Sequence, residues 1–221
     1  MKRKIIVMTA LLVTGLVVMY AQDRSHIKND ISRWGRCLNV ALTQTRGNVA
    51  MDGTRASWAN IPNELHTELQ GQVNRGSRIW DVHITESGAW VMVTSTTVIS
   101  SRGVPTEFQN THMRMSREGN NVLAASFNCH GQWIIIGERT WSSSNAEFAW
   151  IQSGANQHGN PVSACFTNEG LVVVFQRGII GAGTYPAGMW AAARDYGGGV
   201  AKFAGNSWFV ADRNGSFSFS M

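Results

Sequence analysis

The sequence predicts an α+β repeat fold in which five strand-strand-helix-strand units form a closed ring, with the two termini closing it. Five glycines lie before apolar strands at spacings of 41, 43, 39 and 35 residues, each in a short polar turn between two extended segments. These turn glycines are Gly47, Gly88, Gly131, Gly170 and Gly205. We therefore expect one domain over residues 23–221 that contains five repeats of about 40 residues.

A helix start lies between successive hairpins, in the segments IPNEL, VPTEF, SNAEF and YPAGM. The first residue of each start is Pro62, Pro105, Asn145 or Pro186. Proline at the start of a helix costs no hydrogen bond, because the N–H it lacks has no helical partner there. Three of the segments place a glutamate two residues later, where the helix dipole favours a carboxylate. Each segment then runs about 14 residues to another glycine, which predicts a short helix.

Further extended segments, TTVISS, RTWSSS, RGIIGAG and SFSFS, complete the units, but only four helices lie between five hairpins. The fifth helix is predicted at the other end of the chain, where Ser25 can cap it, Ile27 and Ile31 share a face and Gly35 ends it. A ring closed by the termini accounts for both ends and removes exposed sheet edges. The alternative is a five-bladed β-propeller, which needs four strands in each blade.

The first strand of each hairpin presents two faces. One face is apolar in all five copies and is expected to pack beneath the helices. Its members are Val40, Val82, Ala125, Ala164 and Ala201. The opposite face would converge near the axis of a ring, and it carries the polar residues Asn39, Asp81, His83, Ser126, Ser163, Cys165 and Lys202.

Two interpretations of this central set remain open. Asp81 and His83 lie on one face of one strand and are expected to pair, and a thiol at Cys165 near a histidine and a lysine would become a thiolate nucleophile. The other interpretation is a polar plug whose groups hydrogen-bond to one another and to water for stability alone.

The order of elements resembles the five-fold α/β propeller of the pentein superfamily, whose members place five such units around a central axis. The resemblance covers the mature chain and concerns its architecture. Pentein-type hydrolases and transferases that act on guanidine groups use a cysteine, a histidine and carboxylates at the centre. The resemblance thus implies Cys165 as nucleophile, His83 as general acid and base, and Asp81 as its orienting partner or a guanidinium-binding carboxylate. Where the family usually has its cysteine, near the C-terminus, this chain offers Lys202.

Nine tryptophans are present. Three lie two or three residues after a turn glycine, where two other units have valine, so packing between units is favoured over sugar stacking. Trp58, Trp141 and Trp190 lie outside that pattern, near helix starts, and are predicted to contact a ligand at the surface. The adjacent Cys129 and His130 fall in a predicted hairpin turn, where they are poorly placed to act together.

The N-terminus reads as a secretory signal over residues 1–22: three cations, an apolar run and a small residue before a polar segment. Its removal takes away three of the five net positive charges and leaves no stable membrane span, whereas an uncleaved segment would act as an anchor. The remainder has no basic cluster, which argues against nucleic-acid binding. The three cysteines and the histidines fit no metal-ligand spacing, so neither a metal nor a cofactor is expected.

The sequence thus predicts a secreted or periplasmic binding or interaction module whose extracytoplasmic ligand is a glycan, a peptide or a protein. The alternative function is a pentein-like hydrolase or transferase with a central cysteine nucleophile.

Overall fold

The computed structural model describes residues 25–197 and 199–221. Five separate sheets form, each of three consecutive antiparallel strands. They comprise β1 (Asn39–Leu42), β2 (Asn48–Asp52), β3 (Arg55–Ala59), β4 (Ile79–Ile84), β5 (Trp90–Thr94), β6 (Val98–Ser100), β7 (Val122–Phe127), β8 (Trp133–Gly137), β9 (Trp141–Ser143), β10 (Pro161–Phe166), β11 (Gly170–Phe175), β12 (Gly178–Gly183), β13 (Val200–Ala204), β14 (Ser207–Ala211) and β15 (Phe217–Ser220). We number the units 1 to 5 by these sheets.

A helix follows each of the first four sheets: α2 (Asn63–Asn74), α3 (Thr106–Arg117), α4 (Asn145–His158) and α5 (Ala187–Asp195). Residues 25–34 are helical and pack against the fifth sheet. The sequence predicts Pro62, Pro105 and Pro186 as the first helical residues. They instead occupy the N-cap positions, one residue before α2, α3 and α5 begin. The predicted five units are therefore present, each with a three-stranded sheet and a helix. The four-stranded blade of the alternative does not form among the described residues, because the fourth element of each unit is a helix.

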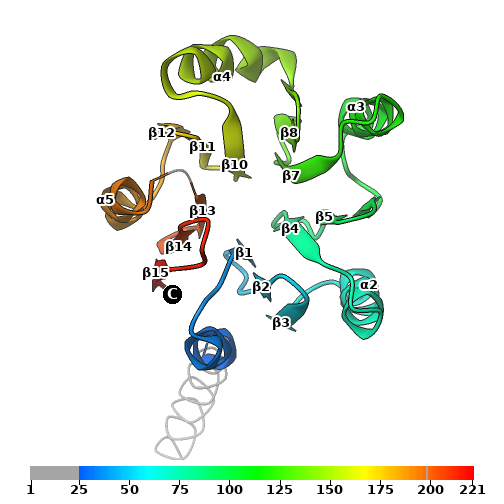
Figure 1. Cartoon of the computed structure of the whole chain (residues 1–221), viewed down its shortest axis with the longest axis vertical. Helices are drawn as coiled ribbons and strands as arrows, with labels where there is room; N and C mark the ends of the chain where they lie inside the picture. The colour runs from blue at the N-terminus through cyan, green and yellow to red at the C-terminus, as the bar shows by residue number, and fades with distance from the viewer. Residues whose placement is uncertain (1–24, 198) are drawn as a thin grey trace, which may run out of the picture.

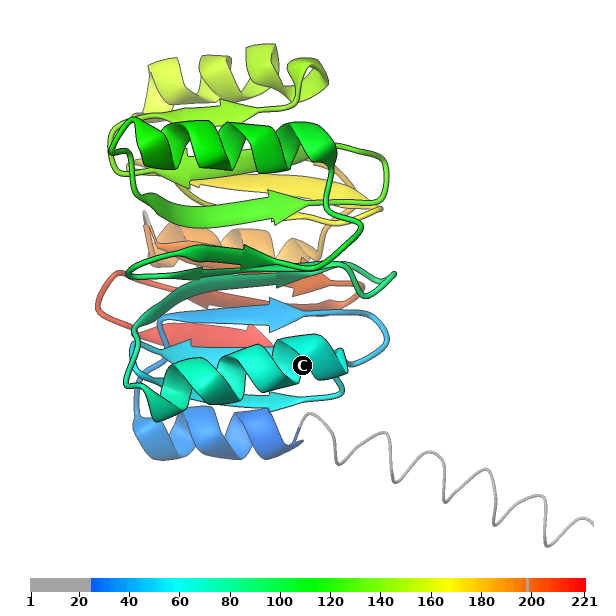
Figure 2. The same ribbon diagram turned by 90° about the vertical axis from the view of Figure 1, so that its right-hand side faces the viewer.

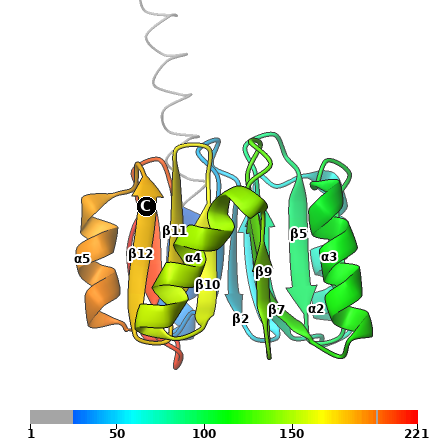
Figure 3. The same ribbon diagram turned by 90° about the horizontal axis from the view of Figure 1, so that it is seen from above.

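Figure 1 shows the five sheets around a common centre, with the first strand of each sheet innermost and the helices outermost. Contacts join the innermost strands in the order β1, β4, β7, β10 and β13, and β13 also contacts β1. Figures 2 and 3 show that the strands and helices lie roughly along one common axis, with neighbouring strands of a sheet pointing in opposite directions. All five hairpin turns after the innermost strands consequently lie at one end, which we call the turn end.

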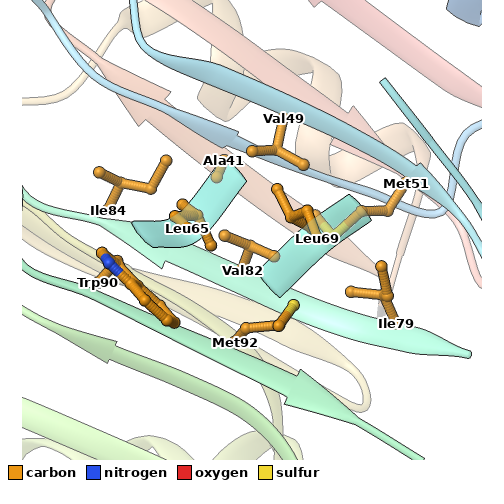
Figure 4. Close-up of a cluster of buried hydrophobic side chains, with 10 residues drawn as sticks. All are labelled: Ala41, Val49, Met51, Leu65, Leu69, Ile79, Val82, Ile84, Trp90 and Met92. Carbon is orange, nitrogen blue, oxygen red and sulfur yellow. The ribbon is translucent and has the colours of Figure 1, made fainter. Parts of the chain in front are cut away.

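Five hydrophobic clusters form the core, and each lies between two neighbouring sheets. The cluster of units 1 and 2 includes Val49, Val82 and Trp90 from the sheets and Leu65 and Leu69 from α2 (Figure 4). The cluster of units 5 and 1 is built in the same way, from both sheets and from Ile27 and Ile31 of the helical segment 25–34. Each helix therefore buries its apolar face over a junction between two units, which a single unit could not provide alone.

One turn glycine differs from the prediction. Gly88, Gly131 and Gly205 have positive φ angles, and Gly47 lies in a turn in which the preceding Arg46 has the positive φ, but Gly170 is the first residue of β11. A Cβ atom at residue 170 would collide with the backbone of Thr184, so the close approach of the segment just after β12 explains this glycine. The predicted signal over residues 1–22 lies outside the described residues. Within the described part of the chain, no helix combines the length and the apolar character needed to cross a membrane.

Candidate functional site

A hydrogen-bonded network at the centre joins the innermost strands of all five units. Its hub is Asp81 of β4, which is 1% exposed. The Asp81 carboxylate accepts hydrogen bonds from Asn39 Nδ2 of unit 1 at 2.8 Å, the backbone N–H of Ala125 of unit 3 at 3.0 Å, and Lys202 Nζ of unit 5 at 2.9 Å. Lys202 also donates to the carbonyl oxygen of Ala164 in unit 4, at 2.8 Å. The polar face predicted from alternate strand residues therefore does converge at the centre.

Asp81 and Lys202 form an ion pair at the centre, and Lys202 is 2% exposed. Burial raises the pKa of Asp81, and the Lys202 ammonium together with the bonds from Ala125 and Asn39 lowers it again, leaving the pKa above its ordinary value. A buried pair of this kind needs both partners, because an uncompensated charge in the interior is costly.

His83 and Asp81 do not pair with each other. His83 Nε2 lies 2.6 Å from the carbonyl oxygen of Phe127, and its Nδ1 lies 3.1 Å from Ser126 Oγ. Ser126 Oγ accepts the backbone N–H of Phe166, so its own proton is directed to Nδ1 and the ring is the neutral Nε2–H tautomer. Burial, together with the smaller effect of the Lys202 charge, lowers the pKa of His83 to about 3, although the bond to Phe127 acts to raise it.

Cys165 is 4% exposed and lies against the backbone of Phe203, whose carbonyl oxygen is 3.4 Å from the sulfur. Burial raises the pKa of the Cys165 thiol above its ordinary value, although the nearby Lys202 charge lowers it. The predicted site residues are thus brought into one region, but Cys165, His83 and Asp81 each bond to other partners. A neutral thiol beside a neutral, fully bonded imidazole lacks the thiolate and the free base that nucleophilic catalysis requires.

The turn end of the centre is closed over. Gln44 of the β1–β2 turn bonds through its backbone N–H to Glu86 of the β4–β5 turn at 2.5 Å, and its side chain bonds to Glu169 of the β10–β11 turn. Asn128 of the β7–β8 turn bonds to Thr167 at 2.9 Å. The cavity left beneath these turns, beside His83 and Cys165, is about 20 Å³, which is room for about one water molecule.

The opposite end of the centre opens into a cavity of about 230 Å³, which we call the central mouth. Its apolar walls are Leu38, Trp80, Leu123 and Val162, each of which lies one residue before the position occupied by Asn39, Asp81, Ala124 or Ser163 on an innermost strand. Asn39 and Ser163 are its buried polar side chains. Ser163 is 1% exposed, and its hydroxyl has no hydrogen-bond partner among the described residues. Such a group is costly unless a water or a ligand satisfies it.

Two arginines and a carboxylate lie around the central mouth: Arg78, Arg213 and Asp212. The Arg78 guanidinium stacks over the ring of Trp80, 4.3 Å from its centroid, and Arg78 forms no ion pair within the described residues. Stacking holds the guanidinium in place and leaves its N–H edge available for a carboxylate.

The three outer tryptophans are not brought together. Trp141 of unit 3 stacks on Phe148 with centroids 5.3 Å apart, and Trp190 of unit 4 stacks on Tyr185 at 5.1 Å. Trp58 of unit 1 donates to His66 Nδ1 at 2.8 Å and lines an open groove of about 440 Å³ beside the helical segment 25–34. Each therefore has its own neighbour on its own unit, and they do not form one aromatic surface.

Trp90 and Trp133 are buried in the clusters between units, which fits the packing role predicted for them. Cys129 is exposed in the β7–β8 turn, as predicted. Across residues 25–197 and 199–221, no three His, Cys, Asp or Glu side chains are grouped so that they could hold a metal ion.

Sequence reasoning missed the walls and rim of the central mouth. The missed signal is the repeated position one residue before Asn39, Asp81, Ala124 and Ser163, which is occupied by Leu38, Trp80, Leu123 and Val162. These large apolar residues near the start of the innermost strands line an opening, and Trp80 and Val162 also pack against the edge of the core.

In comparisons of the sequence with known proteins, no family model and no curated protein matches the chain.

Proposed function

We propose that the five units form a closed α/β propeller, in which the helical segment 25–34 serves the fifth sheet. Two observations support this architecture. The innermost strands contact one another in a continuous cycle, and the junction between units 5 and 1 has the same kind of core as the other four junctions.

We further propose that this propeller is an exported binding module whose ligand is a small organic molecule held in the central mouth. The observation that carries this proposal is the Ser163 hydroxyl, which is buried and without a partner in the wall of an open cavity. Binding pockets generally combine apolar walls with a few fixed polar groups, and the central mouth has this composition. Its volume lies below the roughly 300–1,000 Å³ of pockets for drug-sized ligands, which favours a compact molecule.

Binding is favoured over thiol catalysis because of where the central groups lie. His83 and Cys165 line the small cavity at the turn end, and neither of them lines the central mouth. A substrate in the open cavity would therefore meet Ser163 and Asn39 and not the thiol. Export follows from the signal-like residues 1–22, and the proposed location is secreted or periplasmic.

Protein-detected NMR with a library of small neutral and charged fragments tests the binding proposal on the full chain. We expect the hits to shift the indole N–H signal of Trp80, and to be lost in Leu123→Trp, which fills the central mouth. The matched control is Asn168→Trp at the exposed turn end, which should keep them. Hits that survive Leu123→Trp, or that cluster on the groove beside Trp58, would overturn the central mouth as the binding site.

A further inference from the structure

We propose that the ligand of the central mouth is a small organic acid that presents its carboxylate to Arg78 and a second oxygen to Ser163. This inference rests on the proposed binding function and specifies the chemical class of the ligand. It depends on which polar groups around the cavity are already used within the protein.

The acidic group at the centre is fully engaged. Asp81 accepts three hydrogen bonds, from Asn39, Ala125 and Lys202, and lies beneath the lining residue Asn39. A cationic ligand would therefore have to compete with a buried ammonium for this carboxylate. That exchange would leave Lys202 charged and unpaired in the interior, which is strongly unfavourable.

The available groups at the centre are donors. Ser163 offers an unused hydroxyl in the wall of the cavity. Lys202 Nζ, bonded to the carbonyl oxygen of the adjacent Ala164, has acceptors for two of its three N–H groups among the described residues. Lys202 does not line the central mouth, but its ammonium is bonded to Ala164, which follows Ser163 in the chain, and a positive charge behind the wall favours an oxygen atom of the ligand next to Ser163, such as a hydroxyl or a carbonyl.

The rim supplies the charge. Arg78 is exposed, its guanidinium lies over the Trp80 ring, and it has no carboxylate partner in the described structure. Arg213, next to Asp212, is a second cation on the rim. A guanidinium fixed on an aromatic face can bind a carboxylate through two parallel hydrogen bonds. The apolar walls between rim and depth, including Leu123 and Val162, fit a short hydrocarbon segment between the two oxygen-bearing ends of the ligand.

Titration of the full chain with three related probes, followed by NMR or calorimetry, tests this assignment. The probes are 4-hydroxybutyrate, its neutral amide, and butyrate, which lacks the hydroxyl. We expect 4-hydroxybutyrate to bind about tenfold or more tightly than the amide, because the amide loses a charge-assisted pair with Arg78. We expect butyrate to bind about threefold to tenfold more weakly than 4-hydroxybutyrate, because it loses the neutral contact with Ser163.

Two variants assign each difference to one residue. Arg78→Gln should abolish the preference for the acid over the amide, and Ser163→Ala should abolish the preference for the hydroxy acid over butyrate. The matched control is Arg117→Gln, at an exposed arginine in the last turn of α3, which should keep both preferences. Ser163→Ala removes a group without a partner, so it is expected to fold normally.

The outcomes separate this inference from the proposed function. Equal affinity for the acid and the amide overturns the carboxylate assignment, as does a preference that survives Arg78→Gln. If fragments in the NMR screen still bind the central mouth in that case, the proposed function stands. If no fragment binds there and no probe binds, both fail.

Discussion

At the scale of the residue, burial determines the pKa and therefore the reactivity of the cysteine side chains. Cys37 and Cys165 are both buried, and burial raises the pKa of the Cys37 thiol to about 12. Cys129, in contrast, lies exposed in a turn. Because the thiolate is the reactive form, the position of a cysteine in this fold predicts its reactivity.

We expect a thiol reagent to modify Cys129 in the native protein and to leave Cys37 and Cys165 unmodified until the protein unfolds. The measurement is labelling across neutral and alkaline pH, with the modified residue identified by mass spectrometry. Modification of native Cys165 at neutral pH, at a rate like that of Cys129, would restore the cysteine-nucleophile hypothesis. The matched control is Cys129→Ser, which should abolish native labelling.

His83 predicts a dependence of stability on pH. Its pKa is about 3 in the folded protein and about 6.5 in an unfolded chain, so between these values only the unfolded state takes up the proton. The free energy of unfolding should therefore be fully retained above pH 6.5. As the pH falls toward 3 it should decrease by up to about 1.4 kcal/mol per pH unit.

Denaturant unfolding at a series of pH values, compared with His83→Gln, isolates this contribution from that of the carboxylates. The variant should have a shallower slope between about pH 6 and pH 4. The control His130→Gln, at an exposed turn residue, should keep the wild-type slope. Equal slopes for the wild type and His83→Gln would contradict the buried neutral imidazole.

At the scale of the single element, the helices are stabilised by packing against the sheets and not by side-chain capping. None of the caps Pro62, Pro105, Ser144 and Pro186 makes a side-chain hydrogen bond to its helix. α4 illustrates this: its sequence is weakly amphipathic, yet Ile151 is fully buried between units 3 and 4. A weak apolar stripe is enough to hold α4 in place, because the two neighbouring sheets cover the inner side of the helix.

For this reason, we expect substitution by alanine to have opposite effects on the free energy of unfolding at two helical glycines. A Cβ atom at Gly154 of α4 would lie 2.6 Å from carbon atoms of Phe175 and Ile180, whereas at Gly71 of α2 the nearest atom is the flexible Arg75 guanidinium at 3.4 Å. Gly154→Ala should lower the free energy of unfolding by about 1–2 kcal/mol, because overpacking outweighs the gain in helix propensity. Gly71→Ala should raise it by about 0.5–1 kcal/mol. Thermal and urea unfolding measure both, and a stabilising Gly154→Ala would show that this junction is loosely packed.

At the scale of the whole molecule, the central network ties distant parts of the chain together. The Asp81–Lys202 pair joins residues 121 positions apart, and its neighbours Asn39, Ala125 and Ala164 come from the other three units. Stability at the centre is therefore a shared property of all five units.

Lys202→Met should lower the free energy of unfolding by about 3–5 kcal/mol, because it leaves the Asp81 carboxylate buried without its counter-charge. The double variant Asp81→Asn with Lys202→Met should recover most of this loss, since the interior then holds no charge at this place. The matched control is Arg33→Gln in the exposed pair with Asp30, where less than about 1 kcal/mol is expected. Guanidinium unfolding measures all three, and a double variant no more stable than Lys202→Met would refute the pairing.

Much of this organisation is local and can be predicted from the sequence. Turn residues, alternating strands and the proline-marked helix starts of segments such as IPNEL depend on a few neighbouring residues, so the five units and their hairpins follow from the pattern. The same periodicity identified the strand face that carries Asp81, His83, Cys165 and Lys202. Gly170 shows the limit of local reasoning, because its role depends on the approach of Thr184, which lies just after β12.

By itself, then, the sequence determined the repeat, the order of its elements and the set of polar side chains that meets at the centre. Only the tertiary structure decided which of these side chains pair and which end of the centre stays open. Asp81 pairs with Lys202 and not with its strand neighbour His83, because hydrogen bonds at the centre run between units rather than along a strand. The turn end is closed by contacts such as Gln44 with Glu86, and Ser163, whose buried hydroxyl has no partner among the described residues, lines the open cavity at the other end. Spacing along the chain carries no information about such contacts between side chains from different units.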